Sequence, residues 1–432
     1  WQGDDEQALR FLTKARQSLP KEHEFAFFLM VMYTAGCLAI SGCHEEALLL
    51  LEDSFSEDCS KGCRNASQLL MARSAIHLYS GNLDAVRSAA NQMILLSKTI
   101  LMPEYWLTYA PYFLGYVDYE QNLIESAAEH FSAVEAQRYF VNTRLYHDAL
   151  LGSALVFQAK GEIDKSWEYA DLARVFAVKA GDPFSMKYSD SFETRLAVLT
   201  GKKVTVPLEC EPGTDSNRFW IEIPSLTKAA YFLGNTEPEE CSEVMQTIVK
   251  SLNRAKKHHN RPQIIKFLAL KALAHDKAGS PEEAHRALEE ALLLAEPHGF
   301  IRTFVDLGQR MAELLGILKD KNPANSYLRR LLDAFGNQEN TEEISDESPD
   351  EYRQSKILKQ SESFNAKELS NRELSVLLLL EQRLSNKEIA CQLYISPETV
   401  KKHTANLCRK LCAKGRRQAV EIAQERGLIP AR

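Results

Sequence analysis

Apolar residues recur at spacings of three and four through most of residues 1–300, which is the pattern of amphipathic helices. In HEFAFFLMVMYTAGCLAISGCHEEALLLLED, residues 23–53, the pattern runs on both sides of Ser41 and Gly42. Glycine adopts the left-handed backbone conformation that ends a helix at little steric cost. The segment therefore predicts two helices joined by a tight turn at Gly42.

The same hairpin recurs at a nearly fixed period. A turn-forming residue stands five positions before a small or short apolar residue, at start-to-start spacings of 39, 39, 41 and 39 residues, in the pairs Gly3 and Ala8, Gly42 and Ala47, Gly81 and Val86, Asn122 and Ala127, and Gly161 and Ser166. Because one hairpin cannot bury its own apolar face, the hairpins are expected to stack. Residues 1–200 thus predict a TPR-like solenoid.

The period breaks after Gly201, where Pro, Gly and β-branched residues predict an irregular insert over residues 201–221. Helical repeats are expected again over residues 222–335, with turns at Gly234 and Gly279 and with Pro281 in the first turn of the following helix. Residues 336–366 are rich in acidic side chains and poor in large apolar ones. This composition predicts a flexible acidic linker.

Residues 367–432 predict a separate domain of four helices. The first three helix starts are marked by capping residues, which are Ser370 with Glu373, Ser385 with Glu388, and Ser396 before Pro397. The third helix is expected to run to about residue 411, and the fourth to span residues 416–426. We therefore expect an all-α protein with two kinds of helical unit.

The third tail helix has two opposite faces. Its inner stripe, predicted to face a small core, consists of Val400, His403, Leu407 and Leu411. Its outer stripe consists of Lys401, Lys402, Ala405 and Arg409. A helix that is apolar inside and cationic outside, and that follows another helix after a three-residue turn, is typical of the DNA-reading helix in helix-turn-helix proteins.

Charge separates the tail from the rest of the chain. Residues 367–432 hold 13 Lys and Arg against 7 Asp and Glu, a net charge of +6, so the preceding residues carry −13 of the total of −7. We expect the tail to bind double-stranded DNA, with base-facing positions at Lys401, Lys402 and Ala405. The positions expected to contact the DNA backbone are Ser385, Asn386, Lys387, Ser396, Thr399, His403, Asn406, Arg409, Lys410 and Arg416.

Two other interpretations remain open. The lysines of the third helix would also suit a solvated helix face that binds nothing. The whole chain would also suit a scaffold or adaptor whose solenoid grips a protein partner, with a degenerate DNA-binding tail. The helix caps, the tight turn and the basic charge of the tail together favour DNA binding.

Several other classes of protein are disfavoured. No apolar run reaches the length of a bilayer crossing, so no membrane segment is expected. The nine cysteines are an odd number scattered through helical patterns, which favours reduced thiols in the cytoplasm. We find no phosphate-binding loop, no metal cluster and no nucleophile paired with a base, and so expect no catalysis, no metal and no cofactor in this chain. Because the chain begins at Trp1, it is expected to be part of a longer one.

The tail resembles the LuxR-type DNA-binding domain through LSNRELSVL, LSNKEIACQLYISPETVKKHTANLCRKL and RRQAV. By position, the resemblance implies base-facing roles for Lys401, Lys402 and Ala405, and dimerisation through the last helix. The family usually has Gly where Arg383 and Cys412 stand. These two departures bear on local stability more than on DNA binding, and they give some support to the degenerate-tail alternative.

YFLGYVDYEQNLIESAAEHF and the segment from LALKALAHDKAGSPEEAHRAL onward resemble the helical-repeat region of the large MalT-like LuxR regulators. This resemblance implies that ATP would act only through an N-terminal NTPase domain, which this chain lacks. It also implies that the repeats sense a small inducer or a regulatory protein, and that paired tails recruit RNA polymerase. The aromatic segment 105–119 is a candidate groove lining or a core segment, and the basic turn at Arg254, Lys257, His258 and His259 is a candidate anion site or a solvated loop.

Overall fold

The computed structural model describes residues 5–18, 23–60, 65–97, 108–138, 141–202, 221–235, 237 and 241–336, and in the tail residues 376–377, 379–381, 384–393, 397–411, 413 and 415–425. All regular elements of these residues are helices, so the predicted all-α class is confirmed. The chain divides into a solenoid unit, Trp1–Thr341, and a tail unit, Glu342–Arg432. Most of the predicted insert (203–220) and of the predicted linker (337–366) lies outside the described residues.

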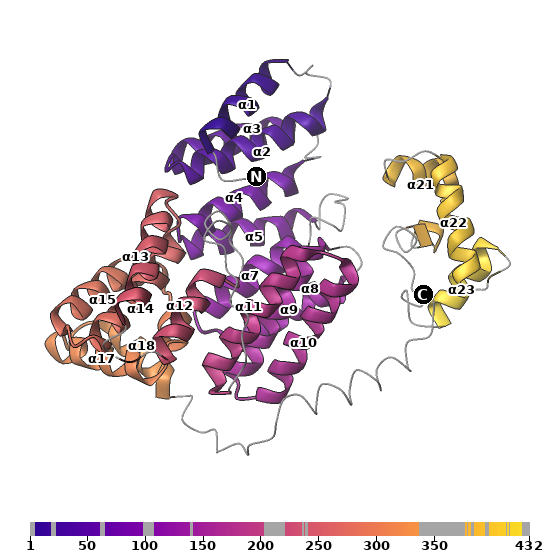
Figure 1. The fold of residues 1–432 in the computed structure, drawn as a ribbon. Helices are drawn as coiled ribbons and strands as arrows, with labels where there is room; N and C mark the ends of the chain where they lie inside the picture. The colour runs from indigo at the N-terminus through magenta and orange to yellow at the C-terminus, as the bar shows by residue number, and fades with distance from the viewer. Residues whose placement is uncertain are drawn as a thin grey trace. The chain divides into compact units, whose positions relative to one another are not determined.

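The first part of the solenoid unit is a stack of helical hairpins (Figure 1). Its helices are α1 (Asp5–Ser18), α2 (Glu24–Ile40), α3 (His44–Ser60), α4 (Ala66–Tyr79), α5 (Leu83–Ser97), α7 (Tyr109–Glu120), α8 (Ile124–Ala136), α9 (Thr143–Ala159), α10 (Ile163–Ala180) and α11 (Pro183–Thr200). Neighbours along the chain pack against each other, as α2 does on α3 and α4 on α5. The TPR-like arrangement predicted from the repeat is therefore confirmed.

The turns of this stack show why the period is readable in the sequence. The turn residues Gly42, Gly81, Asn122 and Gly161 all have positive φ, at 90°, 73°, 62° and 77°. Five positions after each turn, Ala47, Val86, Ala127 and Ser166 are fully buried. A left-handed residue is needed to reverse the chain, and a small residue is needed where the two helices meet.

The second part of the solenoid unit continues with shorter elements. These are α12 (Pro224–Asn235), α13 (Cys241–Lys257), α14 (Arg261–Lys277), α15 (Pro281–Ala295), η2 (Glu296–His298), α16 (Arg302–Val305), α17 (Gln309–Lys321) and α18 (Ser326–Gly336). Gly279, at φ 71°, forms the predicted turn, and Pro281 begins α15. Gly234, predicted at a turn, is the last residue but one of α12, which ends at Asn235, and the next described helix begins at Cys241. The Asn235 side-chain amide donates to the Tyr231 carbonyl oxygen within the same helix.

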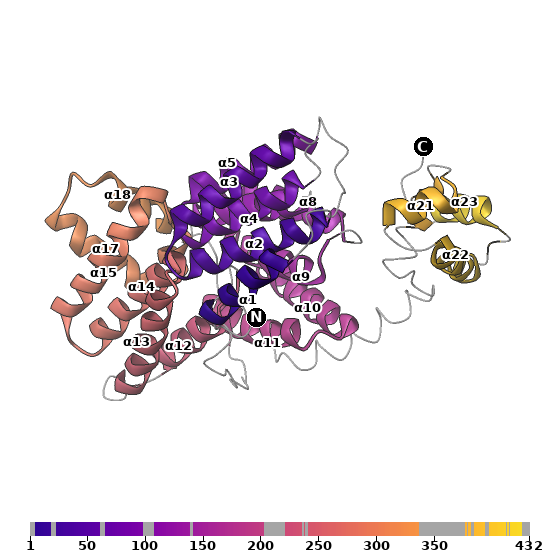
Figure 2. The same cartoon turned by 90° about the horizontal axis from the view of Figure 1, so that it is seen from above.

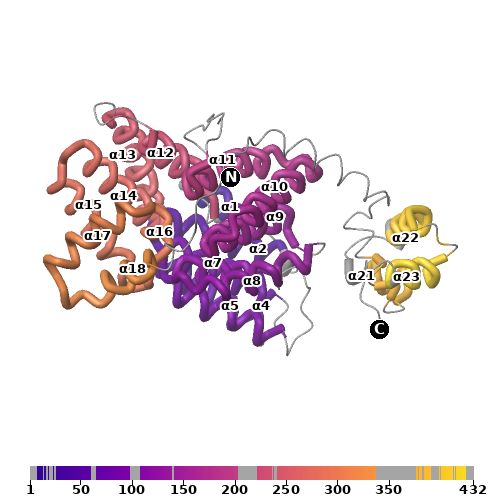
Figure 3. Tube along the Cα trace, turned by 90° about the horizontal axis from the view of Figure 1, so that it is seen from below, coloured from indigo at the N-terminus to yellow at the C-terminus, as the bar shows by residue number. Residues whose placement is uncertain are grey.

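The second part packs back against the first, as Figures 2 and 3 show from above and below. Helix α14 contacts α4, and α16 contacts α7. The Ile301 backbone N–H donates to the Glu120 carbonyl oxygen at 2.7 Å, and the Gln121 side-chain amide donates to the His298 carbonyl oxygen at 3.1 Å. The end of α7 is thus joined to the segment around η2 and α16.

The turn between α13 and α14 also packs on the hairpin turns of the first stack. His259 has a positive φ of 53°, and a Cβ placed on Gly42 would lie 2.6 Å from its Nε2 atom. A Cβ on Gly81 would lie 3.0 Å from Cδ of Arg261. His258 is 7% exposed. The basic turn predicted as an anion site or a solvated loop therefore takes part in a packed contact.

Replacing Gly42 by alanine is expected to destabilise the solenoid unit by about 2–3 kcal/mol. An L-residue at positive φ costs roughly 1–2 kcal/mol, and the added methyl group must also displace the His259 ring. The matched control is Gly181→Ala, because Gly181 has φ 62° and no atom within 4 Å of a built Cβ. It should cost only about 1 kcal/mol in urea unfolding. Equal losses for the two variants would show that the His259 contact contributes nothing.

The aromatic segment of α7 lies in the core of the solenoid unit. Tyr112 and Phe113 are fully buried, and Tyr116 and Tyr119 are 5% and 6% exposed. The Tyr112 hydroxyl donates to Asp148 at 2.5 Å. Of the two interpretations of this segment, the core one fits its described part, and residues 105–107 lie outside the described residues.

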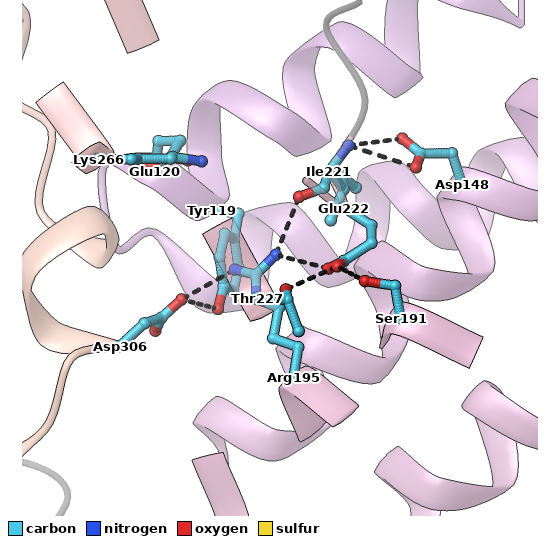
Figure 4. A network of polar contacts seen from close by, with 10 residues as sticks. All are labelled: Tyr119, Glu120, Asp148, Ser191, Arg195, Ile221, Glu222, Thr227, Lys266 and Asp306. Carbon is cyan, nitrogen blue, oxygen red and sulfur yellow. Dashed lines mark hydrogen bonds and ion pairs between the residues drawn. The ribbon is translucent and has the colours of Figure 1, made fainter. Parts of the chain in front are cut away.

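A buried carboxyl group holds the chain where it re-enters the solenoid after the insert. The Ile221 backbone N–H donates to both oxygens of Asp148, at 3.3 and 3.1 Å, and Nη1 of Arg195 donates to the Ile221 carbonyl oxygen at 2.9 Å (Figure 4). Burial raises the pKa of Asp148 to about 7, although the hydrogen bonds from Tyr112 and Ile221 act in the opposite direction.

The described helices of the tail unit are α21 (Asn386–Leu393), α22 (Pro397–Leu411) and α23 (Arg416–Glu425). The first predicted tail helix lies mostly outside the described residues. In its described part Val376 and Leu377 are fully buried, and Leu380 is 6% exposed. Helix α22 packs on both α21 and α23. The bounds predicted for the third helix agree with those of α22.

Candidate nucleic-acid interface

Helix α22 is fixed in the tail unit by the apolar stripe read from the sequence. Val400 and Leu407 are fully buried, and Leu411 is 2% exposed. They share the core with Ile389 of α21 and Ala419 of α23, both also fully buried. His403 belongs to the same stripe and is half-buried. The stripe thus sets which face of α22 is turned outward.

The start of α21 has the reciprocal cap that the sequence predicted. The Ser385 backbone N–H donates to Oε2 of Glu388 at 2.7 Å, and the Glu388 backbone N–H donates to Oγ of Ser385 at 3.4 Å. The hydrogen bonds from the Ser385 side chain and backbone lower the pKa of the exposed Glu388 carboxyl. This cap fixes where α21 begins, and with it the positions of Asn386 and Lys387.

The outward face of α22 is cationic and accessible. Lys401, Lys402, Ala405, Asn406 and Arg409 are all exposed. The Lys401 ammonium lies 3.9 Å from a Glu398 oxygen, but both side chains are about 70% exposed, at 70% and 71%. Water screens such a pair strongly, so the Lys401 ammonium remains available to a ligand. Nη2 of Arg409 donates to Oδ1 of Asn406 at 3.2 Å, which orients the guanidinium along the helix.

The other positions expected to contact the DNA backbone lie near helix ends, with varied exposure. Ser385 and Lys387 at the start of α21 and Arg416 at the start of α23 are exposed, whereas Asn386 and Lys410 are half-buried. Thr399 lies in the first turn of α22, but its side chain is outside the described residues. Ser396 and the two departures from the family pattern, Arg383 and Cys412, are also outside them.

Comparison with known families gives the same division of the chain. Residues 2–321 match the model described as the MalT-like TPR region, and residues 367–423 match the model described as bacterial regulatory proteins of the luxR family. The chain belongs to the MalT-like regulators of the luxR family. In this MalT-like regulator the luxR match includes the whole of α21 and α22 and most of α23.

Part of the chain is similar in sequence to curated transcriptional regulators. The chain is 31% identical over 209 residues to the HTH-type transcriptional regulator MalT of Klebsiella pneumoniae (strain 342) and, to the same extent, to that of Cronobacter sakazakii (strain ATCC BAA-894). Each match covers 46% of this chain and 22% of the relative. The chain therefore spans about a fifth of the length of these relatives.

The described residues offer neither a membrane segment nor a metal site. None of their helices combines the length and the apolar character that a membrane crossing needs. In the same part of the chain, no three His, Cys, Asp or Glu side chains are grouped so that they would hold a metal ion.

One candidate site of the solenoid unit was not predicted from the sequence, because neither the aromatic segment 105–119 nor the basic turn at residues 254–259 lines it. A cavity of about 620 Å³ opens there between residues of α11, α12, α14 and the α16 region. The sequence does contain a sign of this site, because two charged residues lie within apolar segments. They are Lys266 in IIKFLAL and Arg302 in GFIRTFV. Charged residues in such windows are rarely buried unless they are paired.

Proposed function

We propose that this MalT-like regulator controls transcription by binding double-stranded DNA through α22, under the control of a signal received by the solenoid unit. The observation that carries the proposal is the exposed row of Lys401, Lys402 and Ala405 on the face of α22 opposite its buried stripe. The membership of the tail in the luxR family supports it.

The dimensions and chemistry of α22 fit a major groove. Its 15 residues form a helix about 22 Å long, and B-DNA admits one helix into its major groove. Lysine donates to guanine O6 and N7, and a small residue such as Ala405 leaves room to approach a thymine methyl group. We assign base contacts to these three outward positions.

Backbone contacts and partners complete the proposal. The start of α21, the C-terminal half of α22 and Arg416 would meet phosphates on either side of the groove. Two tails would pair through α23 on adjacent half-sites and recruit RNA polymerase. The net charge of −13 before residue 367 would keep the solenoid unit from holding DNA indiscriminately. The signal would be a small inducer or a regulatory protein.

The test is selection of duplexes from a random DNA library by the 432-residue chain, followed by anisotropy titrations of the selected duplex at several salt concentrations. Six cationic side chains are assigned to DNA, namely Lys387, Lys401, Lys402, Arg409, Lys410 and Arg416. We expect log Kobs to fall with log salt at a slope of up to about −5 per tail. Failure to enrich any sequence, combined with salt-independent binding, would contradict the proposal and favour the scaffold alternative.

A further inference from the structure

The cavity of the solenoid unit is lined by stripes from two helices. Along α14 the lining residues Lys266, Leu270, Leu273 and Lys277 follow one another at spacings of four, three and four. Along α12 they include Leu226, Ala230 and Leu233. The α carbons of Lys266 and Lys277 are about 16 Å apart, because each residue of a helix rises 1.5 Å. The cavity is therefore an apolar passage with a cation on α14 toward each end.

The end at Lys266 is a closed network of paired charges (Figure 4). Nζ of Lys266 lies 2.6 Å from Oε1 of Glu120, and the Thr303 hydroxyl donates to the other Glu120 oxygen at 2.8 Å. Arg302 and Arg195 lie 2.5 and 3.3 Å from the two oxygens of Asp306. Arg195 also lies 3.7 Å from Glu222. Three cations thus meet three carboxylates, so this end is formally neutral.

The end at Lys277 differs. Its ammonium donates to the Leu233 carbonyl oxygen at 2.6 Å, and no carboxylate of the described residues pairs with it. The neighbouring pair at the rim is complete, because Arg310 binds both oxygens of Asp276, at 2.6 and 2.7 Å. Of the cations that line the cavity within the described part of the chain, Lys277 is therefore the one whose charge is not balanced.

The lining of the cavity is better suited to an aliphatic ligand than to a neutral sugar. Apart from the charged ends, the lining is mainly Leu, Val and Ala, and no described lining residue is aromatic. Neutral sugars bind preferentially where aromatic rings stack on them, and that feature is missing here. Nε of Arg302, on the same wall and in a side chain 2% exposed, has no hydrogen-bond partner among the described residues.

We infer that this cavity binds a small organic monoanion, a carboxylate with an extended apolar body, whose charged head pairs with Lys277 and whose body lies along Leu270 and Leu273. This inference rests on the proposed function, since it identifies the class of inducer that the solenoid unit receives. One cation without a paired carboxylate favours a ligand with a single negative charge, and the neutral network at the far end offers no second cation of this kind.

The experiment is isothermal titration calorimetry of the whole chain, without DNA, at pH 7 with octanoate and with octanamide. The two probes share an apolar body and differ in charge. We expect octanoate to bind at least about tenfold more tightly, because a hydrogen bond to a charged group contributes more than one to a neutral group. Equal affinity for the two probes, or no heat from either, would overturn the inference without the use of any variant.

Three variants locate the binding. Lys277→Gln should remove the preference for octanoate, and Ala230→Phe, which fills the cavity, should weaken both probes. Lys271→Gln, on the same helix but outside the lining, should leave the preference unchanged. Octanoate binding that survives both Lys277→Gln and Ala230→Phe would place the site elsewhere and overturn the inference. Because these titrations contain no DNA, their failure is distinct from a failure of DNA binding, which anisotropy measures on the same preparation.

Discussion

Replacing Lys401 and Lys402 together by alanine is expected to weaken binding to the selected DNA duplex about a hundredfold or more. Each lysine that reads a base contributes roughly 1–3 kcal/mol of discrimination, and both lie on the exposed face of α22. Neither side chain belongs to the core of the tail unit, so the fold should survive the change. The measurement is anisotropy with the selected duplex and with a scrambled one of equal length.

The matched control is Lys256→Ala with Lys257→Ala at the end of α13. This pair is also adjacent and exposed, and its removal changes the net charge of the chain by the same amount. We expect less than about a threefold effect on DNA affinity, because these two lysines belong to the solenoid unit, to which no DNA contact is assigned. Equal losses from both double variants would mean that α22 acts only through bulk charge. An unchanged affinity for the α22 variant would refute its assignment as the reading helix.

The features that sequence predicted well are those set by local chemistry. A turn that must adopt positive φ selects Gly or Asn, and the hairpin contact five residues later selects a small side chain, as at Gly81 with Val86. A helix start selects Ser with Glu three residues on, as at Ser385 and Glu388. Each rule acts within a few residues, so it leaves a readable trace.

Local chemistry places a helix end only to within about a residue or two, as Gly234 shows. This glycine was predicted at a turn, yet it is the exposed last residue but one of α12, which ends at Asn235. The helices of the tail were also predicted from local patterns, namely capping residues and the spacing of apolar residues. The apolar residues of its inner stripe, Val400, Leu407 and Leu411, are buried, whereas the base-facing roles of Lys401, Lys402 and Ala405 stay predictions.

The cavity escaped prediction for a different reason. Its charged network joins Glu120 of α7, Arg195 of α11, Lys266 of α14 and Asp306 beyond α16, which are far apart in the sequence. A charge within an apolar segment, as at Lys266, suggests a buried ion pair, but the sequence does not identify its partner. Their pairing arises only because the second part of the solenoid packs back on the first, and no periodicity along the chain encodes that contact.

Separating Glu120 from Lys266 is expected to have the largest effect on stability. Their side chains are 4% and 8% exposed. Burial lowers the pKa of Lys266, but the nearby Glu120 carboxylate outweighs burial and raises it, so the ammonium stays charged. Glu120→Gln would leave that charge buried without a counter-charge, which costs about 3–5 kcal/mol. Urea unfolding of the whole chain measures the loss.

The double variant Glu120→Gln with Lys266→Met distinguishes two quantities. One is the contribution of the ion pair to the free energy of unfolding, and the other is the cost of leaving one of its charges buried alone. Removing both charges avoids the uncompensated ammonium, so the double variant should be more stable than Glu120→Gln alone. The control is Glu290→Gln, which breaks an exposed pair of α13 and α15 with a similar distance of 2.8 Å and should cost less than about 1 kcal/mol. If Glu120→Gln costs no more than this control, the network at the far end of the cavity is open to water. The cavity would then lack the neutral, closed end that restricts its ligand to a single charge.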